Sequence, residues 1–269
     1  MEEASAAPWL DLPLSETLQP PVRCELVDGA MVLIDRSPGH VMNRVFCLGL
    51  EKPATAKTVE RIGEVYREAG IDAFLVHLSP MARPTALPRM LEEHGIKLAG
   101  REAVAVREAT RVRRPDPFFK IQPAGSSDYE AVSSILDGIG GLPRSFIDLI
   151  SKSAGQPNWN QFIALDGTKP YALSGIYIQG KRAWMAPGWT LPDYRNRGVH
   201  AAMITHCINT AADAGCSWIT TSYPARTEDR TRSFERAGFK LLYMRSLFRP
   251  DAAPLMPMGV TAAEPERAK

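Results

Sequence analysis

Apolar and polar positions alternate along the chain with two periods, which predict helices and strands in turn. In the first half, the period is helical from residue 54, with Val59 and Ile62 on one face, and Gly70 is placed to end that helix. The pattern predicts helices at residues 54–69 and 87–94 and strands at residues 44–50, 73–78 and 102–107. The first half is therefore expected to form an α/β lobe.

The second half continues the alternation over a longer stretch. Ser126 and Ser127 precede its first helix as cap candidates, and Asp166–Gly167 is a turn dipeptide between two strands. The pattern predicts strands at residues 118–122, 161–165, 172–178, 183–190, 217–223 and 239–248, and helices at residues 128–136, 143–151, from a loop near 198 to about 214, and 229–237. This order predicts a second lobe of α/β type, with a mixed sheet.

Prolines mark the ends of the two lobes. Residues 1–22 are proline-rich and are expected to be a flexible arm, and residues 251–269 are expected to be a disordered tail. The stretch RVRRPDP at residues 111–117 has the composition of a linker. The sequence therefore predicts an N-terminal lobe over residues 23–112 and a C-terminal domain over residues 117–250.

The two lobes share a short repeated pattern. Residues 69–74 read AGIDAF and residues 214–219 read AGCSWI; residues 91–98 read LEEHGIKL and residues 234–241 read FERAGFKL. The glycines of the two copies are separated by 25 and 23 residues. The same order at nearly the same separation suggests an internal duplication with a degenerate first copy.

Composition and charge exclude several classes of protein. The formal net charge is +2, from 32 basic and 30 acidic residues, whereas a nucleic-acid-binding protein usually has a large basic excess. No apolar run is long enough to predict a membrane span, and the first residues do not resemble a secretory signal. The four cysteines fit no metal-binding spacing, so we expect reduced thiols, no metal and a cytoplasmic protein.

The segment at residues 189–204, WTLPDYRNRGVHAAMI, is the strongest candidate for chemistry. A predicted strand enters a loop with one glycine, and the loop opens a helix whose first N–H groups and dipole favour an anion. Gly198 permits close approach to the backbone, and Arg195 and Arg197 could pair with phosphate oxygens. The segment lacks the glycine pattern of nucleoside triphosphate loops and that of dinucleotide-binding loops.

Arg195-x-x-Gly198-x-His200 resembles the pyrophosphate-binding motif R/Q-x-x-G-x-G/A of the GNAT superfamily of N-acetyltransferases. Residues 190–192 are typical of the family's fourth strand, and residues 233–239, SFERAGF, resemble its closing segment Y-E-x-x-G-F. The resemblance covers about residues 118–248. It implies a GNAT-like acyl-CoA N-acyltransferase fold, with acetyl-CoA as co-substrate and the N-terminal lobe as a degenerate relative.

The resemblance also implies a cofactor-binding role for individual positions. It assigns the backbone of Trp189, Thr190 and Leu191 to the pantetheine arm, and Phe234 to the thioester end. It assigns the pyrophosphate to the backbone amides of Arg195, Asn196, Arg197, Gly198, Val199, His200 and Ala201. Binding both reactants side by side would supply much of the rate by proximity, and a backbone N–H of the fourth strand could polarise the thioester carbonyl.

The chain departs from the family pattern at two positions. His200 stands where the family has a small residue, and its side chain must point away from the phosphates or contact them. Phe234 stands where the family has the tyrosine general acid, and phenylalanine has no proton to donate. Tyr223 is the replacement acid suggested by the sequence, although a strand-end aromatic needs no such role. Glu228 is a candidate for a group near the acceptor, although an acidic residue that opens a helix also serves as a dipole partner.

The function expected from the sequence is acetyl transfer from acetyl-CoA to the primary amine of a small molecule by direct attack on the thioester. One alternative is an acyl-CoA-binding sensor without turnover, which the missing tyrosine favours. Another is a protein N-acetyltransferase, which an acidic or basic face on the N-terminal lobe would favour. The expected partner is a small amine, without nucleic acid or membrane, and the expected state is a monomer or a homodimer.

Overall fold

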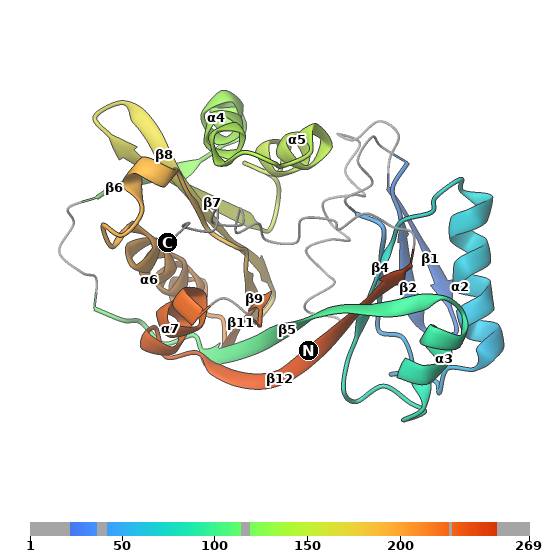
Figure 1. Cartoon of the computed structure of the whole chain (residues 1–269). Coiled ribbons are helices and arrows are strands. Elements are labelled where there is room, and N and C mark those ends of the chain that lie inside the picture. The colour runs from blue at the N-terminus through green and yellow to red at the C-terminus, as the bar shows by residue number, and fades with distance from the viewer. Residues whose placement is uncertain (1–21, 37–41, 114–118, 226–227, 252–269) are drawn as a thin grey trace, which may run out of the picture. The chain divides into compact units, whose positions relative to one another are not determined.

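The computed structural model describes residues 22–36, 42–113, 119–225 and 228–251 (Figure 1). The chain divides into two compact units. Unit 1 holds the residues up to Val104 and those from Leu241, and unit 2 holds Ala105–Lys240. Both units contain strands and helices, as the alternating pattern predicts. No helix within the described ranges is long and apolar enough to cross a membrane.

Unit 1 begins with a hairpin and adds strands from distant parts of the sequence. Strand β1 (Arg23–Val27) pairs with β2 (Ala30–Ile34), which pairs with β3 (Arg44–Phe46). The next strand is β4 (Leu75–Leu78), parallel to β3. Beyond it lie β12 (Lys240–Pro250), antiparallel to β4, and β5 (Ile96–Glu108).

Two helices supply the core of unit 1. Helix α2 (Ala56–Glu68) begins at a capping box, in which Thr55 and Thr58 each accept from the other's backbone N–H. Helix α3 (Leu87–Glu93) follows β4. On α2, Tyr66 is fully buried, stacks on Phe74 with 4.2 Å between ring centroids, and donates its hydroxyl to the carbonyl of Leu33. The apolar face predicted for this helix therefore lies in the core of unit 1.

The structure corrects some predictions in unit 1. The strand predicted at residues 44–50 ends at Phe46, because Cys47 and Gly49 take positive φ values of 60° and 74° and turn the chain. The strand predicted at residues 102–107 is much longer and begins at Ile96. The hairpin of β1 and β2 was not predicted, although its turn has the sequence Asp28–Gly29, with φ values of 49° and 83°.

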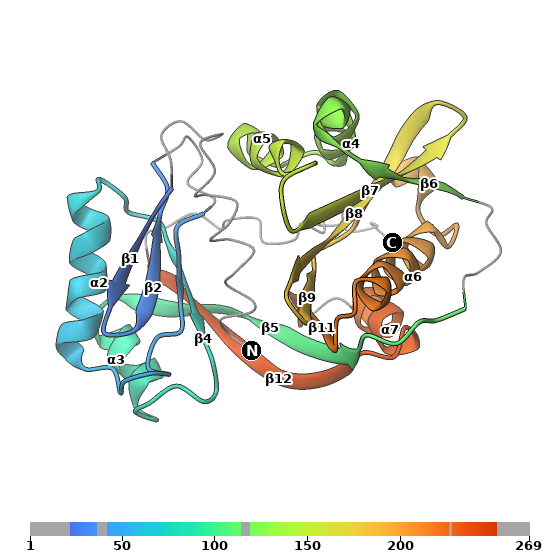
Figure 2. The same ribbon diagram turned by 180° about the vertical axis from the view of Figure 1, so that it is seen from behind.

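Unit 2 is a sheet covered by helices on both faces. Its first elements are β6 (Lys120–Ala124), α4 (Tyr129–Ile139), α5 (Arg144–Lys152), β7 (Trp159–Asp166) and β8 (Lys169–Gln179). There follow β9 (Arg182–Met185), β10 (Trp189–Thr190), α6 (Val199–Asp213), β11 (Trp218–Pro224) and α7 (Glu228–Arg236). Figures 1 and 2 show α4 and α5 on one face of the strands and α6 and α7 on the other.

The unit boundaries differ from the predicted domain boundaries. The sequence predicts a break near residues 111–117, of which residues 114–117 lie outside the described part. In the structure, the boundary falls inside β5, between Val104 and Ala105, and inside β12, between Lys240 and Leu241. The end of β5 lies next to β11 in unit 2, whereas β12 pairs with β4 in unit 1. Strands β5 and β12 thus each belong partly to unit 1 and partly to unit 2. Local sequence patterns do not encode this division. The predicted arm and tail lie outside the described residues, except Val22 and Asp251 at their edges.

The repeated sequence pattern corresponds to a repeated backbone conformation. Gly70 and Gly215 follow helices α2 and α6 with φ values of 74° and 73°. Gly95 and Gly238 follow helices α3 and α7 with φ values of 74° and 84°. Each glycine ends a helix in the left-handed region and precedes a strand, so residues 56–108 and 199–250 share the order helix, strand, helix, strand.

Candidate functional site

The fourth strand predicted for unit 2, residues 183–190, is broken in the middle. Strand β9 runs parallel to β11, with Arg182–Met185 opposite Trp218–Thr221. After Ala186–Gly188 the chain resumes as β10, which pairs with β8 through Trp189 and Thr190. Among the described strands, β10 has no second partner. Its other edge therefore offers backbone groups to a ligand that lies alongside it.

The loop after β10 uses one of the predicted pyrophosphate-binding amides itself. The Arg195 N–H donates to the carbonyl of Pro192 at 3.1 Å, so the candidate anion site begins at Asn196. Asn196 and Gly198 have φ values of 61° and 85°, in the left-handed region, and Gly198 is the N-cap of α6. Among the described residues, no side chain caps this helix end. Residues 195–198 are exposed. Successive N–H groups in such a turn, together with the positive end of the helix dipole, form an anion-binding concavity.

Arg195 and Arg197 are both exposed on this loop and are tied to neighbouring groups. Arg195 donates from Nε to the carbonyl of Thr190 at 3.2 Å. The guanidinium of Arg197 lies 5.1 Å from the ring centroid of Tyr194, and Tyr194 stacks on Tyr171. These contacts leave other guanidinium N–H groups of both side chains available in the loop, which suits the binding of phosphate oxygens.

The His200 side chain is half-buried and lies against the break between β9 and β10. A methyl group placed at Gly188 would lie 3.3 Å from Cδ2 and 3.5 Å from Nε2 of His200. The imidazole also meets the ring of Phe234 edge to face, with 6.1 Å between centroids. His200 therefore extends from the first turn of α6 to the break between β9 and β10.

Tyr223, the candidate proton donor, lies beside Phe234, which stands at the position of the family's tyrosine. Their rings are stacked, and both side chains are buried. Burial raises the pKa of the Tyr223 hydroxyl, and the negative charge of Glu235 raises it further, against a hydrogen bond with Thr231 that lowers it. The phenol stays protonated at neutral pH, as a proton donor must, but the raised pKa makes it a weaker acid.

Four of the remaining predicted site residues lie in β10, directly after it or in the first turn of α6, whereas the side chain of the fifth is not described. Thr190 and Leu191 lie in β10 and directly after it, and Val199 and Ala201 lie in the first turn of α6. The structure thus brings together the break, the loop and Phe234. Glu228 opens α7, but its side chain lies outside the described residues, so its predicted role stays a prediction.

A small cavity lies beside the break and was not predicted. It is about 10 Å³ in volume, which is close to the space of one water molecule. It is lined by Ile150, Trp159, Gln161, Leu173, Ser174, Gly175, Ala186 and Trp189. The nearest sequence signal is Pro187–Gly188, a dipeptide that commonly interrupts regular structure.

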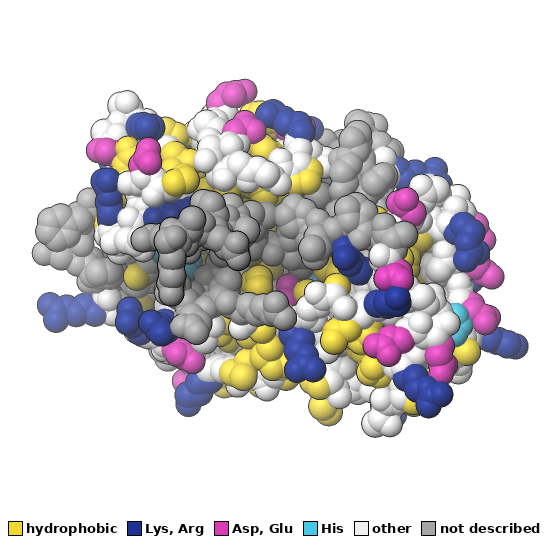
Figure 3. Space-filling model, viewed as in Figure 1, with side chains coloured by type: hydrophobic (Ala, Val, Ile, Leu, Met, Phe, Trp, Pro, Cys, Tyr) yellow, Lys and Arg dark blue, Asp and Glu magenta, His cyan; other side chains and the backbone are white. Residues whose placement is uncertain are grey.

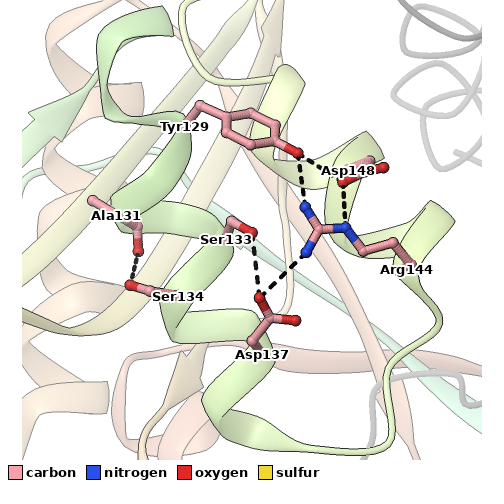
Figure 4. Close-up of polar contacts among 7 residues, drawn as sticks. All are labelled: Tyr129, Ala131, Ser133, Ser134, Asp137, Arg144 and Asp148. Atoms are coloured by element: carbon pink, nitrogen blue, oxygen red, sulfur yellow. Dashed lines mark hydrogen bonds and ion pairs between the residues drawn. The ribbon is translucent and has the colours of Figure 1, made fainter.

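Helix α5, which borders this cavity through Ile150, is held to α4 by a polar network (Figure 4). Arg144 donates to Asp148 at 2.9 Å and to Asp137 at 3.4 Å, and the hydroxyl of Tyr129 donates to Asp148 at 2.7 Å. At the other end of α5, Gln161 donates from its amide nitrogen to the carbonyl of Ile150 at 2.9 Å. These contacts hold α5 in place beside the break between β9 and β10.

Cys207 faces the interior of unit 2 from α6. Burial raises its pKa to about 12, and its Sγ lies 3.6 Å from Oγ of Ser174. A thiol that is protonated at neutral pH is a poor nucleophile, so this cysteine is a packing residue. None of the four cysteines forms a disulfide.

The fold of the chain is similar to that of solved GCN5-related N-acetyltransferases. A GCN5-related N-acetyltransferase from Kribbella flavida superposes with a TM-score of 0.68 at 16% identity, over 93% of this chain and 95% of its own. A second, from Sphaerobacter thermophilus, gives 0.63 at 16% identity, over 86% and 79% of the two chains.

A tandem GNAT protein from the clavulanic acid biosynthesis pathway gives a TM-score of 0.57 at 10% identity, over 79% of this chain and 75% of its own. No protein-family model and no curated protein sequence matches the chain. At these identities, the likeness establishes the fold, and the fold class predicted from the sequence is confirmed.

Proposed function

We propose that this protein is an N-acetyltransferase that uses acetyl-CoA and acts on the primary amine of a small molecule. The observation that carries the proposal is one continuous segment, residues 189–201, in which an unpaired strand edge leads into an exposed amide-rich loop and a helix N-terminus. A coenzyme A thioester has a pyrophosphate for the loop and an amide-bearing arm for the strand edge.

The parts of the segment fit this ligand in detail. The pyrophosphate would be held by the backbone amides of residues 196–201 and by the side chains of Arg195 and Arg197. Backbone groups of Trp189–Leu191 would bind the pantetheine arm as a neighbouring strand does.

The reaction is an attack of the neutral amine on the thioester carbonyl, in which a C–N bond forms and the C–S bond breaks. The amine nitrogen loses a proton and the thiolate gains one. Binding both reactants in one orientation supplies most of the acceleration. A backbone N–H at the break could stabilise the developing oxyanion, and the Tyr223 hydroxyl is the proposed proton donor.

A small acceptor is favoured over a protein acceptor by the charge distribution. On the face shown in Figure 3, acidic and basic side chains of the described residues are interspersed, without a large patch of one sign. A protein substrate is commonly recruited by a complementary charged surface. The nearly neutral net charge of +2 agrees with this.

Calorimetric titration with acetyl-CoA, followed by free-thiol release over a panel of small amines and amino acids, tests the proposal. We expect saturable binding and amine-dependent thiol release. Absence of binding would contradict the assignment of residues 189–201.

The second candidate is a sensor that binds acyl-CoA without turnover. It is favoured by Phe234 at the acid position and by the raised pKa of Tyr223 beside it. Binding without thiol release for every amine in the panel would support the sensor and contradict the enzyme.

A further inference from the structure

The His200 imidazole lies between two groups that the proposed function assigns to the cofactor. On one side is Gly188, at the break before β10. On the other side is Phe234, whose ring the imidazole meets edge to face. A thiol arm that follows the free edge of β10 toward Phe234 would have to enter the space that this imidazole fills.

Gly188 makes this position of His200 possible. A Cβ atom there would approach the imidazole to 3.3 Å, closer than an ordinary van der Waals contact. The edge-to-face geometry with Phe234 is a favoured arrangement of aromatic rings. The inward rotamer of His200 is therefore a packed conformation with contacts on two sides.

The same side chain has another position within reach. His200 is the second residue of α6 and follows the left-handed Gly198, so no helical turn precedes it. The clash with a preceding turn, which restricts rotamers in the middle of a helix, does not apply there. The residues before it, Arg195–Gly198, are exposed. Rotation toward that side would move the imidazole from the strand edge to the phosphate loop.

We propose that His200 is a gate of the coenzyme A site. Its inward rotamer fills the space between Gly188 and Phe234 that the thiol arm would enter, and its outward rotamer vacates that space. The gate rests on the proposed function, since it needs a ligand that follows β10. A protein that binds only in its open form has its apparent affinity reduced by the open fraction. His200 thereby sets how tightly the donor binds.

The test is calorimetric titration of the full chain with acetyl-CoA. His200→Ala removes the gate and is expected to bind about tenfold more tightly, as for an open fraction of roughly one tenth. His200→Phe keeps an aromatic ring of similar size and is expected to bind no more tightly than the unaltered protein. His206→Ala is the matched control, because His206 lies on the same helix against Phe162; its affinity should be unchanged.

A second readout is the rate of binding in a stopped-flow experiment. If opening precedes binding, the observed rate levels off with acetyl-CoA concentration in the unaltered protein and rises linearly in His200→Ala. Equal or weaker binding by His200→Ala would overturn the gate, and so would tighter binding by His200→Phe. In either case, binding by the unaltered protein leaves the proposed function standing. If neither the unaltered protein nor His200→Ala binds, both inferences fall.

Discussion

The rings of Tyr223 and Phe234 are stacked, with 5.1 Å between their centroids and 11° between their planes. Tyr223 is the last residue but one of β11, whereas Phe234 lies in α7. The contact places a phenol directly beside the position where the family resemblance expects one. It also encloses that phenol, since Tyr223 is only 4% exposed.

If Tyr223 donates the proton to the leaving thiolate, Tyr223→Phe should lower kcat about a hundredfold with little change in acetyl-CoA affinity, because positioned proton transfer contributes on about that scale. Steady-state thiol release and calorimetry would measure the two quantities. Tyr243→Phe, on β12 in unit 1, is the control. Full activity of Tyr223→Phe would remove this residue from the mechanism.

Phe234→Tyr should raise kcat, because it restores a hydroxyl at the position where the family has its tyrosine acid. The ring that stacks on Tyr223 is unchanged. We expect a gain of about tenfold. The same thiol-release assay measures it, and the double variant Tyr223→Phe with Phe234→Tyr shows whether the new hydroxyl replaces the old one. A double variant as slow as Tyr223→Phe would contradict the equivalence of the two positions.

Gly198→Glu should abolish acetyl-CoA binding, because a carboxylate at the helix N-terminus would occupy and repel the anion position. Gly180→Glu is a closely matched control. Gly180 also has a positive φ and no neighbouring atoms within 4 Å, so the backbone strain is similar. Calorimetry on both folded variants gives the comparison, and unchanged affinity of Gly198→Glu would contradict the phosphate-binding role of the loop.

Glu102→Gln should destabilise unit 1 by about 3–5 kcal/mol, since it leaves a buried guanidinium without its countercharge. In the native protein, Arg245 donates to Glu102 at 2.7 Å, and both side chains are buried. Burial alone would raise the pKa of Glu102, but Arg245 and His77 together hold it well below its usual range. Urea unfolding would measure the loss. Glu93→Gln, which removes an exposed pair with Arg89, should leave the midpoint unchanged.

His77 should make the protein less stable as the pH falls from about 6.5. Burial lowers its pKa to about 3, helped by the positive charge of Arg245, whereas the unfolded chain titrates near the ordinary value of about 6.5. Between these values the unfolded state binds a proton that the folded state does not. The free energy of unfolding therefore falls by about 1.4 kcal/mol per pH unit from this group.

The pH range from about 6.5 to about 4.5 isolates this contribution, because Glu102 loses its own stabilising effect only at lower pH. Urea unfolding of the unaltered protein and of His77→Gln over this range measures the two slopes. Glutamine can still accept from Arg44, whose Nη1 lies 3.3 Å from Nε2 of His77. Equal slopes would show that His77 does not carry the acid sensitivity.

The parts of the fold predicted from sequence are those with a strong local signal. Helix α2 has an apolar face and a glycine directly after its C-terminal turn, and both features act within a few residues. The amide-rich loop was predicted for the same reason, because Gly198 and the arginines beside it act locally. The hairpin at Asp28–Gly29 also had a local signal, which the interpretation missed.

The features that were not predicted depend on contacts between distant residues. The inward position of His200 requires space at Gly188 and a ring at Phe234, and neither is visible in the motif that contains His200. The extension of β5 back to Ile96 and the placement of β12 beside β4 depend on strand pairing across most of the sequence. Periodicity identifies a strand but not its neighbour.

The pairing of β12 with β4 joins strands that are far apart in the sequence, and this affects folding during synthesis. The residues of β1 to β4 are synthesised long before those of β12 (Lys240–Pro250), yet β12 pairs with β4. The edge of β4 that pairs with β12 therefore stays open until Lys240–Pro250 has been synthesised. Such edges invite wrong pairing. Unit 1 can therefore complete its sheet only after β12 has been synthesised.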